Sequence, residues 1–259
     1  MILRLMTYNV HRWGDDRTAL AEVITTCKPE LLMVQEAPTW WGTRRRRLGF
    51  ADSIGLSYLA GEARTAAFVS DPTRWSIRTK RIWRPALRRR KSYWIPQLPG
   101  GAVALTTTIN PSKINSGKID SGKIESGKIN SGQLNGVQLS VLGCHLGLSN
   151  SGRVVEMDQL LGMVRDLADA CVVVGDVNEP AGGPVWRLAG QAGLIDAAAK
   201  QPTMTFPSAE PRARIDAVWT SATVRADVVD LGAIGLDHSL LVPASDHLPL
   251  VIDLVVSPS

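Results

Sequence analysis

Short apolar segments that end abruptly in polar residues recur along the whole chain, and they constrain its fold more than any other feature. Each segment has the length of a β-strand and is rich in valine, isoleucine, leucine or threonine. We therefore predict strands at eight places, namely Ile2–Val10, Leu31–Glu36, Ala66–Ser70, Ala102–Ile109, Val137–His145, Cys171–Asn178, Ile215–Trp219 and Leu248–Val256.

Three segments between these strands have the pattern of amphipathic helices. Asp15 or Asp16 can cap a first helix, which carries its apolar side chains on one face. These side chains are Ala19, Leu20, Val23, Ile24 and Cys27. A second helix follows Asn150/Ser151, and a third begins near Pro184, since proline suits the first helical turn. Strands and helices interleave without strict alternation, which favours an α/β fold with mixed sheets.

No linker divides the chain, so we expect a single domain over residues 1–259. One segment stands apart: residues 116–135 read SGKID SGKIE SGKIN SGQLN. A period of five matches neither a helix nor a strand, and four copies are too few for a solenoid. We interpret residues 111–136 as an exposed hairpin extension or disordered loop without a catalytic role. The weaker alternative is that the lysines of this segment bind phosphate. These are Lys113, Lys118, Lys123 and Lys128.

Several bulk features exclude other classes of protein. No apolar stretch reaches the roughly 18–20 residues that a membrane span needs. The first ten residues contain Arg4 within an apolar run and lack a small-residue cleavage site, so we expect a strand there and not a signal peptide. Three cysteines without CxxC spacing suggest neither a disulfide framework nor a zinc site. We expect a cytoplasmic protein, with a monomer as the default state.

The net charge of +5 conceals a strong asymmetry. Between Arg44 and Lys91 lie fourteen basic and three acidic residues, which leaves the rest of the chain net negative. A basic segment beside an acidic site suits an enzyme that acts on polyanions. A solvated surface is the equally weighted alternative.

Two basic runs in this segment, RRRR at 44–47 and RRRK at 88–91, are candidates for binding substrate. Aromatic residues are interleaved with them, so the segment could line a groove for a phosphate backbone with stacking surfaces. Packing of the aromatic rings, with the arginines outside, is the alternative. The aromatic residues are Trp40, Trp41, Trp75, Trp83, Tyr93 and Trp94, and the candidate substrate-binding residues are Arg44, Arg45, Arg88 and Arg89.

Four carboxylates lie beside predicted strands, where burial costs several kcal/mol unless a cation or dense hydrogen bonding compensates it. They are Glu36, Asp176, Asp216 and Asp246. Together with nearby asparagines and histidines they suggest convergence at one end of a sheet core, where α/β sites usually form. Carboxylate and amide oxygens without cysteine favour Mg²⁺ or Mn²⁺ over zinc. Such cations serve phosphoryl chemistry by neutralising oxygens and positioning water.

Six motifs in a fixed order resemble those of a known enzyme family. They are TYN (7–9), QE (35–36), His145, GDVN (175–178), RID (214–216) and SDH (245–247). The order is similar to that of the endonuclease/exonuclease/phosphatase superfamily, which contains deoxyribonuclease I, apurinic endonucleases, inositol polyphosphate phosphatases and bacterial sphingomyelinases. Each motif is weak alone, but the set spans nearly the whole chain. The resemblance implies a four-layer sandwich of two packed mixed sheets flanked by helices, with the site at one edge.

The resemblance also implies a role for each oxygen-bearing residue. Glu36 would be the principal metal ligand, with Asn9 and Asp246 close to the same ion or its waters. Asp176 would orient and deprotonate the attacking water, and Asn178 would hold a phosphate oxygen. A metal-activated water would then hydrolyse a phosphate ester.

The two histidines would act on the phosphoryl group. His247 would hydrogen-bond a phosphoryl oxygen, with its ring fixed by Asp216. In the nuclease branch, the histidine that matches His145 acts near the leaving group and has an acidic partner on the strand corresponding to 64–70. This chain lacks an acidic residue there, with Glu62 slightly displaced. His145 is therefore either a general acid or a phosphate ligand.

Some of these residues also have plainer interpretations. Asp216 could pair with Arg212 or Arg214. Asp237-His238 is a second Asp-His pair, which we assign to a loop because it does not enter an apolar strand. For His11 we expect a structural role.

The sequence favours hydrolysis of phosphodiester bonds, with nucleic acid as the leading substrate because of the basic segment. The alternative is a phosphatase or phosphodiesterase that acts on inositol phosphates, phospholipid headgroups or other small phosphate esters. A non-catalytic polyanion-binding module is a third hypothesis, which the intact motifs disfavour.

Overall fold

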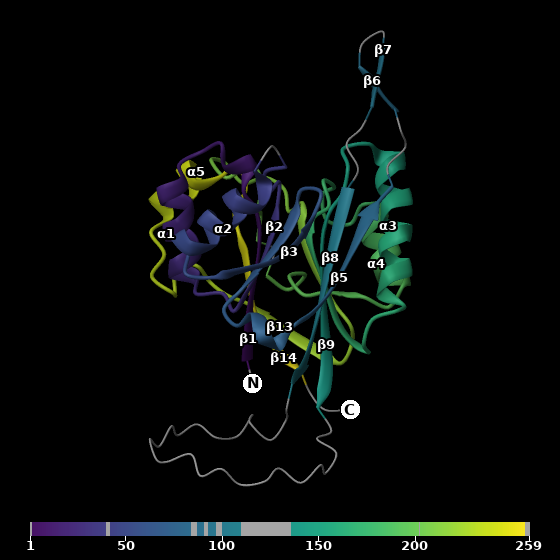
Figure 1. Ribbon diagram of the computed structural model, residues 1–259. Coiled ribbons are helices and arrows are strands. Elements are labelled where there is room, and N and C mark those ends of the chain that lie inside the picture. The colour runs from purple at the N-terminus through teal and green to yellow at the C-terminus, as the bar shows by residue number, and fades with distance from the viewer. Residues whose placement is uncertain are drawn as a thin grey trace.

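The computed structural model describes residues 2–39, 42–83, 87–90, 93–96, 100–109, 136–201 and 203–256, with the side chains of 87–90, 93–96 and 109 left out. Two six-stranded sheets lie face to face in this structure, with helices on their outer sides (Figure 1). This is a four-layer α/β sandwich of two packed mixed sheets flanked by helices, as predicted.

The first sheet, sheet A, contains both chain ends of the described structure. Its order is β13 (Val224–Val228), β14 (Leu250–Val256), β1 (Ile2–Asn9), β2 (Leu31–Gln35), β4 (Thr65–Val69) and β3 (Ser57–Glu62). The pair β1–β2 is parallel, and the other pairs are antiparallel.

The second sheet, sheet B, also has one parallel pair, β9–β10. Its order is β11 (Ile195–Asp196), β12 (Asp216–Thr220), β10 (Ala170–Asp176), β9 (Val137–His145), β8 (Gly100–Ile109) and β5 (Ser76–Ile82). A separate hairpin of β6 (Leu87–Arg90) and β7 (Tyr93–Pro96) is inserted between β5 and β8.

The helices divide between the two outer faces. Sheet A is covered by α1 (Arg17–Cys27), α2 (Thr43–Ser53) and α5 (Leu241–Ala244), and sheet B by α3 (Asn150–Val164) and α4 (Pro184–Gln191). Asp16, and not Asp15, caps α1 by accepting from the N–H groups of Thr18 and Ala19, and the five predicted apolar positions of α1 are buried. The second helix begins at Asn150 with Ser149 as its cap, and the third begins at Pro184 as predicted.

The interior between the sheets is almost wholly aliphatic because the central strands are covered on both faces. Every residue of β2 and β10 is buried, for example. All eight predicted strands are present, and their ends differ from the prediction by no more than two residues. There are two further apolar cores, one between sheet A and its helices and one between sheet B and its helices.

The repeat segment falls outside the described residues, which omit 110–135, so its predicted conformation is untested. The strand ends on either side of it, Ile109 and Val137, are paired with each other in the β8–β9 ladder. His145 lies at the other end of β9, eight positions along a strand that rises about 3.3 Å per residue. The flanking ends of the repeat therefore lie far from His145.

Gly175 is the position where the backbone geometry most restricts the sequence. Its φ is +144°, a conformation that residues with a Cβ rarely adopt. A Cβ built there would collide with the carbonyl oxygen of Cys144 on the neighbouring strand. The glycine of the GDVN motif thus allows β9 and β10 to approach closely one residue before Asp176.

We predict that Gly175→Ala destabilises the protein by about 3 kcal/mol or more, because strain and collision act together. The free energy of unfolding in urea measures this. As a matched control, Gly190→Ala lies in α4, where a Cβ meets nothing within 4 Å, so it should stabilise by about 0.5–1 kcal/mol. Equal stability of the two variants would contradict the assignment.

Candidate active site

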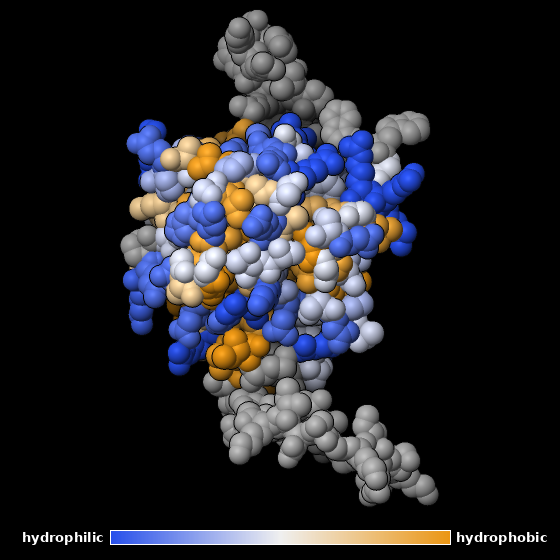
Figure 2. All heavy atoms as spheres, turned by 90° about the vertical axis from the view of Figure 1, so that its left-hand side faces the viewer, coloured by the Kyte–Doolittle hydropathy of each residue, from blue (hydrophilic) through white to orange (hydrophobic). Residues whose placement is uncertain are grey.

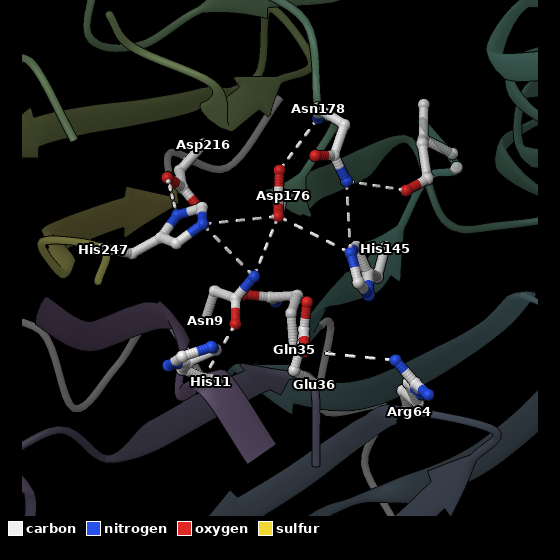
Figure 3. Close-up of polar contacts among 12 residues, drawn as sticks. Asn9, His11, Gln35, Glu36, Arg64, His145, Asp176, Asn178, Asp216 and His247 are labelled. Carbon is white, nitrogen blue, oxygen red and sulfur yellow. Dashed lines mark hydrogen bonds and ion pairs between the residues drawn. The ribbon is translucent and has the colours of Figure 1, made fainter. Parts of the chain in front are cut away.

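The ends of five central strands bring the predicted residues together. Asn9 and Gln35 are paired at the ends of β1 and β2. Asp176 is paired with His145 on one side and with Asp216 on the other. The amide Nδ2 of Asn9 donates to Asp176 Oδ2 at 2.9 Å, and this hydrogen bond joins sheet A to sheet B (Figure 3). The site therefore lies where one end of each sheet faces the other.

Asp176 lies at the centre of the cluster and is 1% exposed. Its Oδ1 accepts from the backbone N–H of Asn178 at 2.8 Å. Its Oδ2 accepts from Asn9 and lies 3.5 Å from His145 Nε2 and 3.7 Å from His247 Nε2. Both oxygens of this carboxylate thus face polar hydrogens or imidazole rings.

His247 is held by contacts on two sides. Its Nδ1 lies 2.9 Å from Asp216 Oδ2, which fixes the ring so that Nε2 faces Asp176. Phe206 packs against the ring, with centroids 4.9 Å apart. Thr205 accepts through Oγ1 from the backbone N–H of Asp216 at 3.4 Å, which holds the end of β12 in place.

The two central groups have displaced pKa values. Burial, and then the negative charge of Asp216, raise the pKa of Asp176 to about 7, although His247 opposes this. Burial lowers the pKa of His247, but the charge and hydrogen bond of Asp216 outweigh it and raise the pKa to about 9. At neutral pH His247 is therefore a cation, and Asp176 can exchange a proton with bound water.

His145 is oriented by Asn178. The Nδ2 of Asn178 lies 3.2 Å from His145 Nε2 and donates to the carbonyl oxygen of Leu146 at 2.9 Å. Its amide hydrogens are therefore already engaged, and a phosphate oxygen would compete with His145 for one of them. Glu62 does not serve His145, because it pairs with Arg81 at 3.1 Å.

Glu36 follows β2 and has a φ of +56°, which turns the chain at the edge of the cluster. Its Oε2 accepts from Arg12 Nε at 2.9 Å and lies 4.0 Å from Arg64. The side chain is 19% exposed. The residue predicted to be the principal metal ligand thus has two arginines around it, and Figure 3 shows it near Asn9 and Arg64.

Arg12 is a residue that the sequence analysis did not single out. It lies in a turn where His11, Arg12 and Trp13 have φ values of +39°, +60° and +58°. Left-handed backbone costs roughly 1–2 kcal/mol per residue, so neighbouring contacts must hold the turn. Trp13 is buried, and the backbone N–H of His11 donates to Asn9 Oδ1 at 3.1 Å. These contacts fix Arg12 beside Glu36, and no sequence pattern marks such a turn.

Asp246 and His11 lie at the rim. His11 Nδ1 is 2.8 Å from Asp15 and 4.0 Å from Asp246 Oδ1, so Asp15 partners a histidine. Burial lowers the pKa of His11, but its contacts with Asp15 and Asp246 raise it overall. Ser245 connects this segment to the cluster by donating from Oγ to the carbonyl oxygen of Asn9 at 2.7 Å.

The residues present fit a divalent cation. One ligand atom from each of Asp176, Asp216 and His247 lies within 4.8 Å of the others, although His247 can ligate a metal only when its imidazole is deprotonated. The Oδ1 atoms of Asp216 and Asp246 are buried and make no hydrogen bond among the described residues. Unpaired buried carboxylate oxygens of this kind are costly unless a cation compensates them. The donor set contains no thiol, which agrees with an oxygen-preferring metal.

The alternative interpretations of Asp216 and of the second Asp-His pair are resolved by their contacts. Arg214 binds both oxygens of Asp196 at 2.9 and 2.6 Å, and Arg212 pairs with Glu210, so neither occupies Asp216. The exposed Asp237 caps the 3₁₀ turn His238–Leu240, as expected for a loop.

The basic segment is divided by the fold. Arg44 and Arg45 are exposed on α2, whereas Arg47 of the same run is buried and donates to the carbonyl oxygens of Pro38 and Ala63. Arg88 and Arg89 belong to β6, whose side chains lie outside the described residues. Trp75 packs against the aliphatic core, while Trp83 is 60% exposed.

The hairpin that carries Arg88 and Arg89 leaves sheet B at the same end as the cluster. Ile82 is paired with Gly100, and Ala102 with Cys144, next to His145. Figure 1 shows β6 and β7 projecting beyond this end of the sheets.

No helix in the described part of the chain has the length and apolar character needed to cross a membrane.

Comparisons with known proteins agree with this geometry. The fold is that of the deoxyribonuclease I-like class. The model of the Endonuclease/Exonuclease/phosphatase family matches residues 6–247, and the chain belongs to this family. No significant match to a curated protein was found.

Solved structures show the same fold at low identity. A mannosyl-6-phosphatase from Bacteroides thetaiotaomicron has 14% identity and a TM-score of 0.63, with 98% of this chain and 99% of that one covered. The human Nocturnin catalytic domain with bound sulfate has 18% identity and a TM-score of 0.64, with 99% and 95% covered. D. rerio TDP2, complexed with a single strand DNA product, has 14% identity and a TM-score of 0.57, with 98% of this chain and 99% of that one covered.

The raised pKa of His247 predicts how stability depends on pH. Its stabilising effect is complete below the ordinary value of 6.5 and is lost as the pH rises through about 9. In chelator, the free energy of unfolding should fall by about 2–3 kcal/mol between pH 7 and 9.5. Asp216→Asn should flatten this slope, because it removes the charge that raises the pKa of His247. Urea unfolding at each pH measures the effect.

Above pH 7, the change in the free energy of unfolding with pH comes mainly from His247 and not from Asp176. Because the pKa of Asp176 is raised from 3.8 to about 7, its effect lowers stability as the pH rises through that lower range. Asp237→Asn, at an exposed carboxylate outside the cluster, should retain the wild-type slope. An unchanged slope in Asp216→Asn would show that His247 is not held as a cation.

Proposed function

We propose that this protein is a metal-dependent phosphodiesterase that cleaves nucleic acid, with one active site over residues of a single domain. The observation that carries the proposal is the buried carboxylate of Asp176, surrounded by Asn9, Asn178 and two histidines. A hydrolase needs such a group beside both a water and a phosphoryl oxygen.

Asp176 acts as the general base in this proposal. Its pKa of about 7 lets it accept a proton from water at neutral pH, and its hydrogen bonds from Asn9 and Asn178 keep the carboxylate fixed. Fixed donors and acceptors lower the cost of reorganisation during the reaction. Either oxygen can receive the proton, and Oδ2 faces the imidazole rings.

His247 stabilises charge on the phosphoryl oxygens. As a cation oriented by Asp216, it presents its Nε2–H toward the space beside Asp176. His145 lies on the opposite side of Asp176, held by Asn178, and is proposed to act near the leaving group or to bind phosphate.

Glu36, Asn9 and Asp246 are proposed to hold Mg²⁺ or Mn²⁺. When bound, the metal would neutralise phosphoryl oxygens and lower the pKa of a water. Arg12 and Arg64 flank Glu36 and add positive charge where an anionic substrate must enter. We therefore add both arginines to the proposed substrate-binding residues.

Nucleic acid is the proposed substrate because basic segments of the sequence extend beyond the carboxylate cluster at this end of the molecule. The β6–β7 hairpin, whose sequence includes Arg88 and Arg89, emerges there, and Arg44 of α2 is predicted to contribute. A small phosphate ester would not require charge at this distance from the carboxylates. The structural neighbour TDP2 was solved with a DNA product, which supports a polyanion.

Asp176→Asn and Glu36→Gln should each lower the rate of plasmid nicking in Mn²⁺ by about 10²–10⁴, because one removes the base and the other a metal ligand. Chelator should abolish nicking by the wild type. The rate is measured on supercoiled plasmid under single-turnover conditions.

The matched controls are Asp237→Asn and His238→Gln, which alter the second Asp-His pair and should nick at the wild-type rate. Release of inorganic phosphate from small esters, with no plasmid cleavage, would replace the proposal by the phosphatase alternative. Binding of polyanions without hydrolysis of any ester would favour the non-catalytic hypothesis.

Arg88→Ala and Arg89→Ala should each weaken binding of DNA and reduce the salt dependence of log K by about one for each lost phosphate contact. Fluorescence anisotropy with Asp176→Asn as the background measures this without cleavage. Arg225→Ala, an exposed arginine of the edge strand β13, is the control and should bind DNA like its parent. A salt dependence unchanged in both hairpin variants would remove the hairpin from the DNA path.

A further inference from the structure

A cavity of about 830 Å³ lies between α1 and α2 on the outer side of sheet A. Its volume is in the range of small-molecule sites, roughly 300–1,000 Å³. None of the clustered residues around Asp176 lines it, so it is separate from the active site. Its lining includes Trp13, Arg17, Arg45, Arg46, Gly49 and Phe50.

The rim of this cavity is cationic. Arg17, Arg45 and Arg46 are exposed, and none of them forms an ion pair with a described residue. Within the described residues, Arg17 donates only to the carbonyl oxygen of Trp13, at 3.3 Å. No carboxylate is among the described lining residues. Three guanidinium groups around one hollow repel one another, and an anion would relieve that repulsion.

The floor of the cavity is apolar. Trp13 and Phe50 are 5% and 6% exposed and pack with ring centroids 4.6 Å apart. The indole N–H of Trp13 is buried without a hydrogen-bond partner among the described residues. Hydrophobic surface is visible between hydrophilic side chains on the face that carries α1 and α5 (Figure 2).

We propose that this cavity binds a small organic anion, a molecule with a phosphate or similar acidic group and an apolar ring. The acidic group would lie among the three arginines, and the ring over the Trp13–Phe50 floor. An inorganic anion would use the rim alone, and an uncharged ring the floor alone. The concave shape and limited volume favour a ligand of nucleotide size over a macromolecule.

Gly49 allows the cavity to be filled without disturbing the fold. A Cβ built at this helical glycine meets nothing within 4 Å. Gly49→Leu would therefore place a side chain at the cavity while favouring the helix. Gly162→Leu is the matched control, since Gly162 is also helical, also open, and lies on α3 over the other sheet.

The probe is anilinonaphthalene sulfonate, an aromatic anion that fluoresces when it leaves water, titrated into the protein in chelator. Gly49→Leu should weaken dye binding at least about tenfold, and Gly162→Leu should change it less than about twofold. Arg45→Gln/Arg46→Gln should weaken binding and reduce its salt dependence. Equal affinity of Gly49→Leu and Gly162→Leu would overturn the proposal.

Competition then separates the two parts of the ligand. Adenosine monophosphate should displace the dye at a lower concentration than inorganic phosphate does, and equal concentrations would overturn the apolar component. The outcome is independent of the proposed catalytic function, because no hydrolysis is measured. Asp176→Asn, which should abolish nicking, should bind the dye like the wild type.

Discussion

The hydrogen bond from Asn9 to Asp176 is the contact on which the arrangement of the site depends. It is the point where the end of β1 in one sheet reaches the end of β10 in the other. A buried hydrogen bond to a charged group contributes about 1.5–3 kcal/mol, and leaving the carboxylate unpaired would cost more. The aliphatic layer between the sheets sets their separation, and this contact uses that separation to bring two sets of strand ends together.

The sequence predicted the centre of the fold and missed its margins, for one physical reason. All eight predicted strands lie inside the sheets, where both faces are covered and apolar runs are continuous. Of the six strands that were not predicted, β3, β5, β11 and β13 are the edges of the two sheets, and β6 and β7 form the separate hairpin. Edge strands are only half paired and carry charge that protects against further pairing. The charged sequence SIRTKRI of β5 therefore has no apolar run to recognise.

The candidate site was predictable to the extent that its residues end apolar strands. Asn9, His145 and Asp176 were found in this way, Asp216 lies at the start of an apolar strand, and the structure brings the four together. Arg12 was not, because its place beside Glu36 depends on a left-handed turn held by tertiary contacts. The helix α2 was also not predicted, because its run of arginines obscures the apolar periodicity. Its buried side is formed by Arg47, Phe50 and Ala51.

Ile109 pairs with Val137, so β8 and β9 are hydrogen-bonded to each other up to the residues where the intervening chain begins and ends. The register of both strands is then independent of how many residues connect them, because loop closure grows only slowly in cost with length. Copies of the five-residue unit could be gained or lost during replication without moving His145. The same ladder end is thus a tolerant point for grafting a tag or a second protein onto this scaffold.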